Sequence, residues 1–249
     1  MKVSALIPAK GFTNAKQRLA PLLDAREREV LAAAMLRDVL GQVVSARGLE
    51  SVFVVTGDEK VREIASSLGS EVIREQNERG ETEAVTFALA EMQRRKIHSV
   101  LVVPGDIPLV RSSDIELLLE QISRHDGASP FALLTPSHDR MGTNALLLSP
   151  PDVIKLRFGY DSFTYHLGEV AAQGLPLRVL GNERIALDID EPRDLESFLE
   201  IVARVRGSCS PNEHDNRARA RVNTGESYER LLKMGVVEAL ENANRSRKL

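Results

Sequence analysis

The sequence predicts an α/β fold with a mostly parallel, mixed sheet sandwiched by helices. Short β-branched runs alternate with amphipathic helical patterns along the first half of the chain. In the helical segments, apolar residues recur at three- and four-residue steps, which is typical of a helix packed on a sheet. Strands are expected at Val3–Ile7, Val52–Thr56 and Val100–Val103. Helices are expected at Arg26–Val44, Glu59–Leu68, Thr82–Met92 and Asp114–Ile122.

Beyond residue 127 the order of elements changes. Two apolar runs, Phe131–Thr135 and Asn144–Leu148, follow each other with only a polar stretch between them. Two consecutive strands predict a small antiparallel insertion. The elements expected after it are a helix near Phe163–Gln173, strands at Leu177–Leu180 and Ile185–Ile189, and a helix that begins at Glu191–Asp194.

Chain length and composition define the expected organisation. The 249 residues suffice for one α/β domain or for two small ones. We expect a folded domain over residues 1–206, because the composition turns polar beyond Gly207. Residues 207–249 are interpreted as a polar C-terminal tail that is either partly helical or disordered, with a weak helical pattern at Tyr228–Leu240.

Charge and composition exclude several classes of function. The net charge of −3 and the absence of Trp argue against a nucleic-acid partner, because neither a basic field nor stacking platforms are available. One cysteine, Cys209, cannot form an internal disulfide and fits a reducing compartment. No apolar run approaches the ~20 residues of a membrane span. A cytoplasmic protein without a membrane partner is therefore expected.

The loop after the first strand carries three cations, Lys10, Lys16 and Arg18, within nine positions. Gly11 has no Cβ, so the loop backbone can approach a polyphosphate closely. This layout suits a nucleoside triphosphate. The loop is weak evidence by itself, because it lacks the paired glycines and the Lys-Ser/Thr ending of a P-loop.

Three carboxylates, Asp106, Asp188 and Asp190, stand at the ends of later apolar runs. Asp106 follows a strand at the edge where open α/β sheets bind ligands. Asp188 and Asp190 point to one face if their segment is extended, and two like charges there need a cation. Hard oxygen donors favour magnesium over zinc. Two alternatives remain: Asp106 caps a turn, or the Asp188/Asp190 pair accepts hydrogen bonds from the following helix.

Two further segments, Gly142–Asn144 and Phe158–Phe163, could hold a carboxylate through hydroxyl and backbone N–H groups. Ser162 is expected at the start of a helix, either as a plain cap or facing an anion. His166 lies about one helical turn beyond it and is interpreted as a surface histidine without a catalytic role. No nucleophile–base constellation stands out, so covalent catalysis is disfavoured.

Taken together, these segments resemble the phospholactate and phosphoenolpyruvate guanylyltransferases of coenzyme F-420 biosynthesis, within the broader GT-A-like (Rossmann-like) nucleotidyltransferases. The resemblance spans roughly residues 1–205 and rests on six segments in the family's order. The segments are IPAKGFTNAKQRLAPLL, EREVLAAAMLRDVL, PGDIPL, GTNALLLSPP, FGYDSF and ALDIDEPRDL.

The resemblance implies transfer of GMP from GTP to the phosphate of a three-carbon phospho-acid, with release of pyrophosphate. It also implies roles for individual residues. Asp106, Asp188 and Asp190 would bind Mg²⁺; Lys10, Lys16 and Arg18 would neutralise the triphosphate; Gly11 and Gly80 would lie against the nucleotide; Thr143, Gly159 and Ser162 would hold the acid's carboxylate; and guanine would lie near Glu75–Glu83.

The chain departs from the family pattern at two places. Arg79–Glu83 replaces a Gly-Leu-Asn stretch that is common in the family, and Tyr160 and Asp161 stand where smaller or uncharged residues are common. Because Asp161 can accept a hydroxyl hydrogen bond, we hypothesise that 3-phosphoglycerate competes with phosphoenolpyruvate and 2-phospholactate as acceptor. The alternatives are a sugar- or cytidylyl-type nucleotidyltransferase, or a non-catalytic nucleotide-binding protein. A homodimer is also open.

Overall fold

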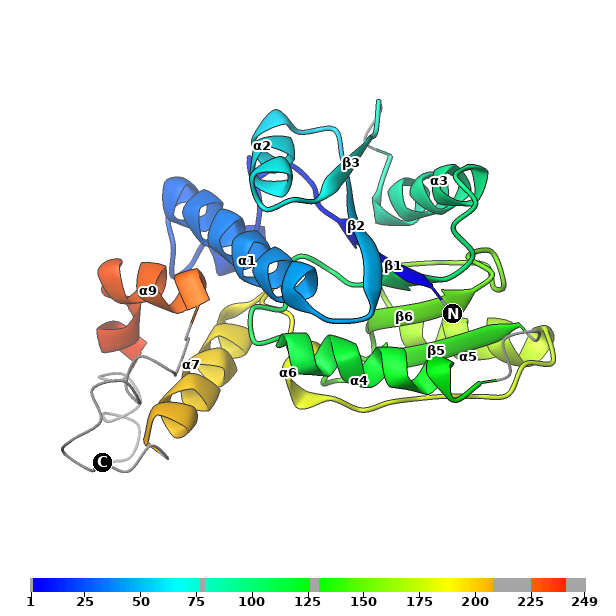
Figure 1. Cartoon of the computed structure of the whole chain (residues 1–249). Coiled ribbons are helices and arrows are strands. Elements are labelled where there is room, and N and C mark those ends of the chain that lie inside the picture. Colours follow the sequence, from blue (N-terminus) through cyan, green and yellow to red (C-terminus); the bar gives the residue numbers. More distant parts are fainter. Residues whose placement is uncertain (1, 77–78, 126–129, 208–224, 241–249) are drawn as a thin grey trace, which may run out of the picture.

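The fold is built on one six-stranded sheet in the order β3-β2-β1-β4-β6-β5 (Figure 1). The computed structural model describes residues 2–76, 79–125, 130–207 and 225–240. Strands β1 to β4 run parallel, whereas β6 runs antiparallel to both β4 and β5. The strands are β1 (Val3–Pro8), β2 (Leu49–Thr56), β3 (Glu71–Arg74), β4 (Val100–Val102), β5 (Phe131–Pro136) and β6 (Thr143–Ser149). The predicted mixed sheet with an antiparallel insertion is confirmed.

Helices cover both faces of the sheet. They are α1 (Ala25–Ser45), α2 (Glu59–Ser67), α3 (Glu81–Arg94), α4 (Ser112–Ser123), α5 (Ser162–Ala172), α6 (Glu183–Ala186), α7 (Pro192–Gly207) and α9 (Gly225–Lys233). Asp24 starts α1 with a capping box, and Asp58 caps α2 by accepting from the N–H of Val61. Within the part of the chain that the structure describes, no helix is long and apolar enough to cross a membrane.

Alternation along the strands divides the buried side chains into two cores. In β1, Ala5 and Ile7 face the core under α1, α4 and α7, whereas Leu6 faces the core under α3 and α5. Figure 1 shows α1 and α7 on one side of the sheet and α3 on the other. Central parallel strands that are buried on both faces account for the continuous apolar runs in the sequence.

One edge of the sheet collects the segments that carry polar residues. β1 and β4 both end there, and β6 begins there because it runs in the opposite direction, with Val102 opposite Leu146. A distant segment joins them, since the N–H of Ile189 donates to the carbonyl of Asp106 at 3.1 Å. The sheet topology therefore brings residues from four separate parts of the sequence together.

Three sequence-based assignments of secondary structure differ from the structure. Ile185–Ile189 was expected as a strand, but Glu183–Ala186 forms the short helix α6, because Asn182 caps it by accepting from two backbone N–H groups. Leu177–Leu180 contributes an isolated bridge from Val179 to Leu134 rather than a strand. The strand β3 was missed, because a four-residue strand at the sheet edge has too short an apolar pattern to be detected.

Residues 225–240 lie in the segment that the sequence assigned to a polar tail, and in the structure they pack against α1. Tyr228 and Leu231 of α9 are buried in the same core as α1. The carboxylate of Asp38 on α1 accepts from the N–H groups of Glu226 (2.6 Å) and Ser227 (2.8 Å) and so caps α9. The domain boundary near residue 206 stays a prediction, and Cys209 lies outside the described residues.

Candidate active site

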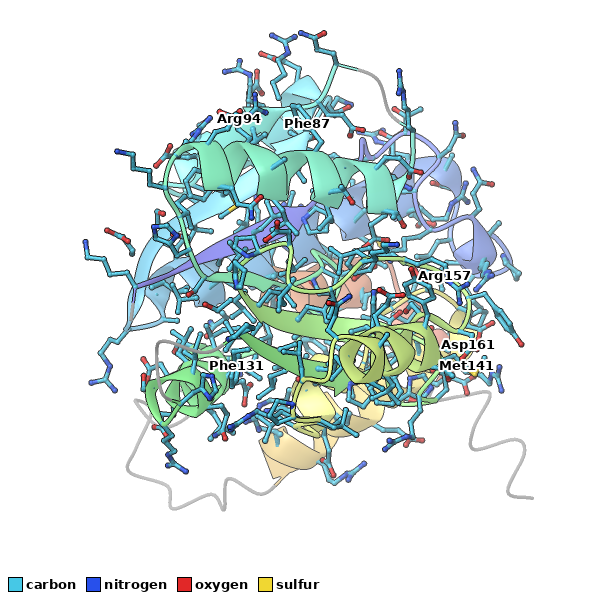
Figure 2. The ribbon with its side chains drawn as sticks, turned by 90° about the vertical axis from the view of Figure 1, so that its right-hand side faces the viewer. Phe87, Arg94, Phe131, Met141, Arg157 and Asp161 are labelled. Carbon is cyan, nitrogen blue, oxygen red and sulfur yellow. The ribbon has the colours of Figure 1, made fainter. Side chains whose placement is uncertain are left out.

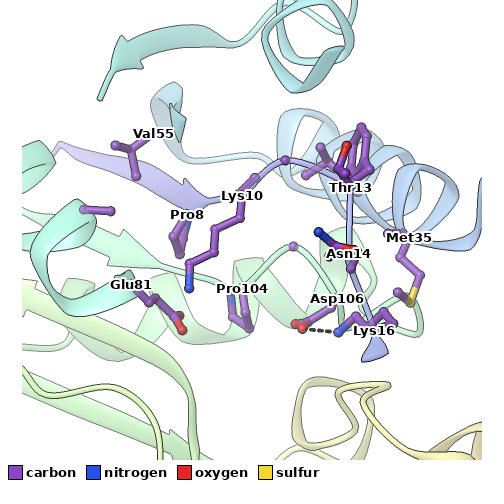
Figure 3. Close-up of a pocket in the computed structure, with 18 of the residues that line it drawn as sticks. Pro8, Lys10, Thr13, Asn14, Lys16, Met35, Val55, Glu81, Pro104 and Asp106 are labelled. Atoms are coloured by element: carbon purple, nitrogen blue, oxygen red, sulfur yellow. Dashed lines mark hydrogen bonds and ion pairs between the residues drawn. The ribbon is translucent and has the colours of Figure 1, made fainter. Parts of the chain in front are cut away.

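The loop that follows β1 lines a cavity of about 480 Å³ at the end of the sheet where β1 and β4 end (Figure 3). Lys10, Gly11 and Lys16 line it, together with Asp106 and Asp190 from distant parts of the chain. A Cβ on Gly11 would lie 2.7 Å from Asp58 Oδ2, so a larger residue would displace the Asp58 side chain that caps α2. Close packing of the loop is thus a second reason for this glycine.

The ammonium group of Lys16 bridges two of the predicted metal-binding carboxylates. Its Nζ lies 2.7 Å from Asp106 Oδ2 and 2.6 Å from Asp190 Oδ1. The Lys16 side chain is only 10% exposed, and its backbone is left-handed, with a φ of 50°. Burial alone would lower the pKa of Lys16, but the two carboxylates outweigh burial and raise the pKa above its ordinary value. One cation therefore holds Asp106 and Asp190 together.

Asp188 belongs to the same acidic group. Its Oδ1 accepts a hydrogen bond from Asn144 Nδ2 at 3.0 Å. Burial and the negative charge of Asp106 raise the pKa of Asp188 to about 6, against the lowering effect of the Asn144 hydrogen bond. Leu187 and Ile189, which alternate with Asp188 and Asp190 in the sequence, are buried in the core. The predicted alternation therefore holds, although the segment forms no strand.

These residues fit a hard divalent cation by their chemistry. Asp106 Oδ1 is buried and has no hydrogen-bond partner, so one ligand atom is available. Carboxylate oxygens are the donors that Mg²⁺ prefers. Among the described residues, no three His, Cys, Asp or Glu side chains are arranged to hold a metal ion, and the Lys16 ammonium supplies the positive charge between Asp106 and Asp190 instead.

Glu81, at the start of α3, is a site residue that the sequence analysis did not assign. Figure 3 shows its carboxylate pointing toward the same space as the Lys10 ammonium. Burial and the negative charge of Asp106 raise the pKa of Glu81 to about 7, although the positive charge of Lys10 opposes this. The departure from the family pattern at residues 79–83 was the available signal. Gly80, with a φ of 126°, immediately precedes Glu81 as the N-cap residue of α3.

The other predicted site residues do not line this cavity. Arg18 lies on a short 3-10 helix, Gln17–Leu19, and its side chain is exposed. Thr143 is the first residue of β6, and Ser162 is the first residue of α5. Gly159 has a φ of 99°, a conformation that favours glycine. Thr143 directly precedes Asn144, whose side chain donates to Asp188, so this one predicted acceptor residue lies next to the acidic residues.

The interpretation of His166 as a surface histidine is wrong, because its side chain is fully buried. Its Nδ1 lies 3.0 Å from Thr143 Oγ1, and its Nε2 lies 3.1 Å from the backbone nitrogen of Arg157. Figure 2 shows Arg157, Asp161 and Met141 at one end of the molecule, close to the start of α5. The helix position of His166 was visible in the sequence, whereas its burial results from the loop that folds over it.

The fold is that of a nucleotidyltransferase. One similar structure is a cytidylyltransferase from Leptospira borgpetersenii serovar Hardjo-bovis (strain JB197), with a TM-score of 0.57, 20% identity and coverage of 82% of this chain and 87% of that chain. Another is CMP:2-keto-3-deoxy-manno-octonic acid synthetase in complex with CTP, with a TM-score of 0.55, 18% identity and coverage of 82% and 100%. At these identities the likeness shows the fold alone.

The chain belongs to the family described as guanylyl transferase CofC like, whose model matches residues 3–221. A 2-phospho-L-lactate guanylyltransferase from Methanothermobacter thermautotrophicus is 37% identical and covers 87% of this chain and 97% of its own. A phosphoenolpyruvate guanylyltransferase from Rubrobacter xylanophilus is 37% identical, with coverage of 78% and 92%. A 3-phospho-D-glycerate guanylyltransferase from Colwellia psychrerythraea (strain 34H) is 34% identical, with coverage of 79% and 90%. The resemblance that the sequence segments indicated is confirmed.

Proposed function

We propose that this protein is a magnesium-dependent guanylyltransferase of coenzyme F-420 biosynthesis. It transfers GMP from GTP to the phosphate of a three-carbon phospho-acid and releases pyrophosphate. The single observation that carries the proposal is the position of Lys16 between Asp106 and Asp190, beside the loop that lines the cavity. Family membership supports it, because the matched relatives are named as guanylyltransferases.

The chemistry needs no general base. An oxygen of the acceptor phosphate is already ionised near neutral pH and attacks the α-phosphorus of GTP. A new oxygen–phosphorus bond forms, the bond to the β-phosphate bridging oxygen breaks, and pyrophosphate leaves with the electron pair. Lys10 and Lys16 neutralise the negative charge that this step concentrates in the cavity. Positioning and charge neutralisation therefore account for the catalysis.

Asp106, Asp188 and Asp190 are the residues that would hold magnesium. When bound, the ion supplies charge neutralisation for the phosphate oxygens of both substrates. Lys16, which bridges Asp106 and Asp190 in the structure, would then give up at least one of these partners to the ion and would pair with phosphate instead. The cytoplasmic location and the homodimer stay predictions.

The three relatives are named for three different acceptors, which leaves the acid to be decided by residues near Thr143, Gly159 and Ser162. Tyr160 is 87% exposed, and Asp161 makes no side-chain cap on α5. A carboxylate with free hydrogen-bonding capacity can accept from a hydroxyl group of the acid. This supports 3-phosphoglycerate as an acceptor besides phosphoenolpyruvate and 2-phospholactate.

The test is an end-point assay with purified protein, magnesium, GTP and each of the three acids in turn. We expect pyrophosphate release and a product whose mass equals that of the acid plus GMP. Parallel reactions with CTP and ATP serve as controls for the nucleotide. Preference for CTP would identify another nucleotidyltransferase, and tight GTP binding without pyrophosphate from any acid would identify a binding protein. Turnover with phospholactate alone would remove 3-phosphoglycerate from the proposal.

A further inference from the structure

His166 connects two parts of the predicted acceptor site through the two nitrogens of one ring. Nε2 lies 3.1 Å from the backbone nitrogen of Arg157, and Nδ1 lies 3.0 Å from Thr143 Oγ1. A backbone N–H can only donate, so Nε2 accepts and carries no proton. In the neutral ring the proton is then on Nδ1, and it donates to Thr143 Oγ1. The hydrogen bonds alone therefore fix the tautomer.

The surroundings of His166 keep the ring neutral and fixed in orientation. The imidazole is fully buried, and the rings of Phe158 and Tyr165 lie edge-on to it, with centroids 5.6 and 5.7 Å away. Burial and the positive charge of Arg157, which stacks over Tyr165 at 4.3 Å, lower the pKa of His166 to about 4. A neutral, immobile imidazole is suited to orient a neighbouring hydroxyl group and unsuited to exchange protons with substrate near neutral pH.

The fixed tautomer determines what the Thr143 hydroxyl can do. Because one lone pair of Oγ1 accepts from Nδ1, the hydroxyl proton is left to donate to another group. A carboxylate is an acceptor only, so it pairs with this donor. The other bond, from the Arg157 N–H to Nε2, holds the loop that contains Gly159 beside the start of β6.

We propose that His166 is a positioning residue for the acceptor acid: it directs the hydroxyl proton of Thr143 toward the carboxylate of the acid and fixes the Gly159 loop beside it. This inference rests on the proposed function, in which Thr143, Gly159 and Ser162 hold that carboxylate. If it is right, His166 does not touch the substrate, affects the affinity for the acid and leaves the affinity for GTP unchanged.

Two substitutions test the two hydrogen bonds of the His166 ring separately. In His166→Asn the amide nitrogen takes the place of Nδ1 and can still donate to Thr143, whereas the Arg157 N–H loses its acceptor. In His166→Gln the amide oxygen takes the place of Nε2 and can still accept from Arg157, whereas Thr143 loses its donor. We expect KM for the acid to rise about 10-fold in His166→Gln and clearly less in His166→Asn, with KM for GTP unchanged in both.

A double-mutant cycle with Thr143 supplies the decisive readout. Thr143→Val removes the hydroxyl group, and Thr143→Ser keeps it. If His166 acts through this hydroxyl, His166→Gln adds no further rise in KM for the acid in the Thr143→Val background, whereas it still raises KM in the Thr143→Ser background, where the hydroxyl is kept. Additive effects in the cycle, or equal rises in KM for GTP and the acid, would overturn the inference. A protein that turns over no acid at all would instead overturn the proposed function.

Discussion

The side-chain amide of Asn144 donates to Asp188 Oδ1 at 3.0 Å, while its neighbour Thr143 is bonded to His166. Two consecutive residues at the start of β6 therefore serve the two predicted halves of the site. Asn144 also donates to the carbonyl of Ile185 at 3.0 Å, so its orientation is fixed from two sides. The order of residues in one strand therefore links the acidic residues to the residues that are predicted to hold the acceptor acid.

Replacing Asn144 with Leu is expected to weaken the magnesium binding that we propose for Asp106, Asp188 and Asp190. Loss of the amide donor removes the bond that lowers the pKa of Asp188, so the pKa rises further above about 6 and protons compete with the metal more strongly. The magnesium concentration for half-maximal activity should increase about 10-fold near pH 6.5 and much less near pH 8. An equal increase at both pH values would contradict this role of Asn144.

Replacing Lys16 with Met is expected to destabilise the protein when no divalent cation is present. Asp106 and Asp190 would then face each other without a counter-ion. We expect a loss of about 1–3 kcal/mol in the free energy of unfolding, less than for a fully buried pair, because the Asp190 side chain is 47% exposed. Thermal denaturation with and without magnesium measures the effect, and the metal should stabilise this variant more than the unsubstituted protein.

Lys10→Met is the matched control for this experiment. Lys10 lines the same cavity, but its side chain is exposed and has no ion-pair partner in the described part of the structure. We expect its melting temperature to stay close to that of the unsubstituted protein, whereas both variants should lose activity. An equal loss of stability in the two variants would show that Lys16 does not act as a counter-ion.

Replacing Glu81 with Gln is expected to flatten the dependence of stability on pH. The folded pKa of about 7 lies above the ordinary value of 4.5, so the folded state binds more protons than the unfolded state between these values. Stability is then lost as pH rises through this window, by about 1–3 kcal/mol. Chemical denaturation near pH 5 and near pH 8 should show a smaller loss in Glu81→Gln than in the unsubstituted protein, because Asp188 and His166 contribute equally to the pH dependence of both.

Glu83→Gln provides the comparison for Glu81, because Glu83 lies in the same first turn of α3 and its side chain is exposed. This substitution should leave the pH dependence unchanged. If Glu81→Gln behaves like Glu83→Gln, burial does not perturb the Glu81 carboxylate. If both flatten the profile, the effect does not arise from the cavity, because Glu83 does not line it.

The sheet and the convergence of the acidic residues could be predicted because they follow from local patterns. Short β-branched apolar runs mark the strands, and Asp106 and Asp190 stand at the ends of apolar runs, where ligands bind in open α/β sheets. The bridging position of Lys16 could not be predicted. Its partners are 90 and 174 residues away in the sequence, and which cation meets which carboxylate depends on the folded loop.

The burial of single polar residues could not be predicted from the sequence either. Nothing in the pattern of α5 separates His166 from an exposed histidine, because the residues that cover it belong to another loop. Glu81 reads as an acidic residue near a helix start, which is ordinary in the sequence. Only its position in the cavity shows that burial disfavours the charged form of its carboxylate. α6 forms at Glu183–Ala186 because Asn182 caps it, and this local signal was outweighed by the apolar alternation that follows.

The last prediction concerns α9, which lies beyond residue 221, where the match to the family model ends. Leu231 is fully buried against α1, whereas its neighbour Leu232 is 43% exposed. If residues 225–240 are part of the folded body, Leu231→Ala should lower the free energy of unfolding by about 2–5 kcal/mol through lost packing and a residual cavity. Leu232→Ala, which removes the same atoms from the surface, should change it by less than about 1 kcal/mol.

Urea denaturation measures both values, and equally small changes would indicate that α9 is not docked in solution. Because no residue of α9 lines the cavity, turnover of GTP under native conditions should be similar in the two variants.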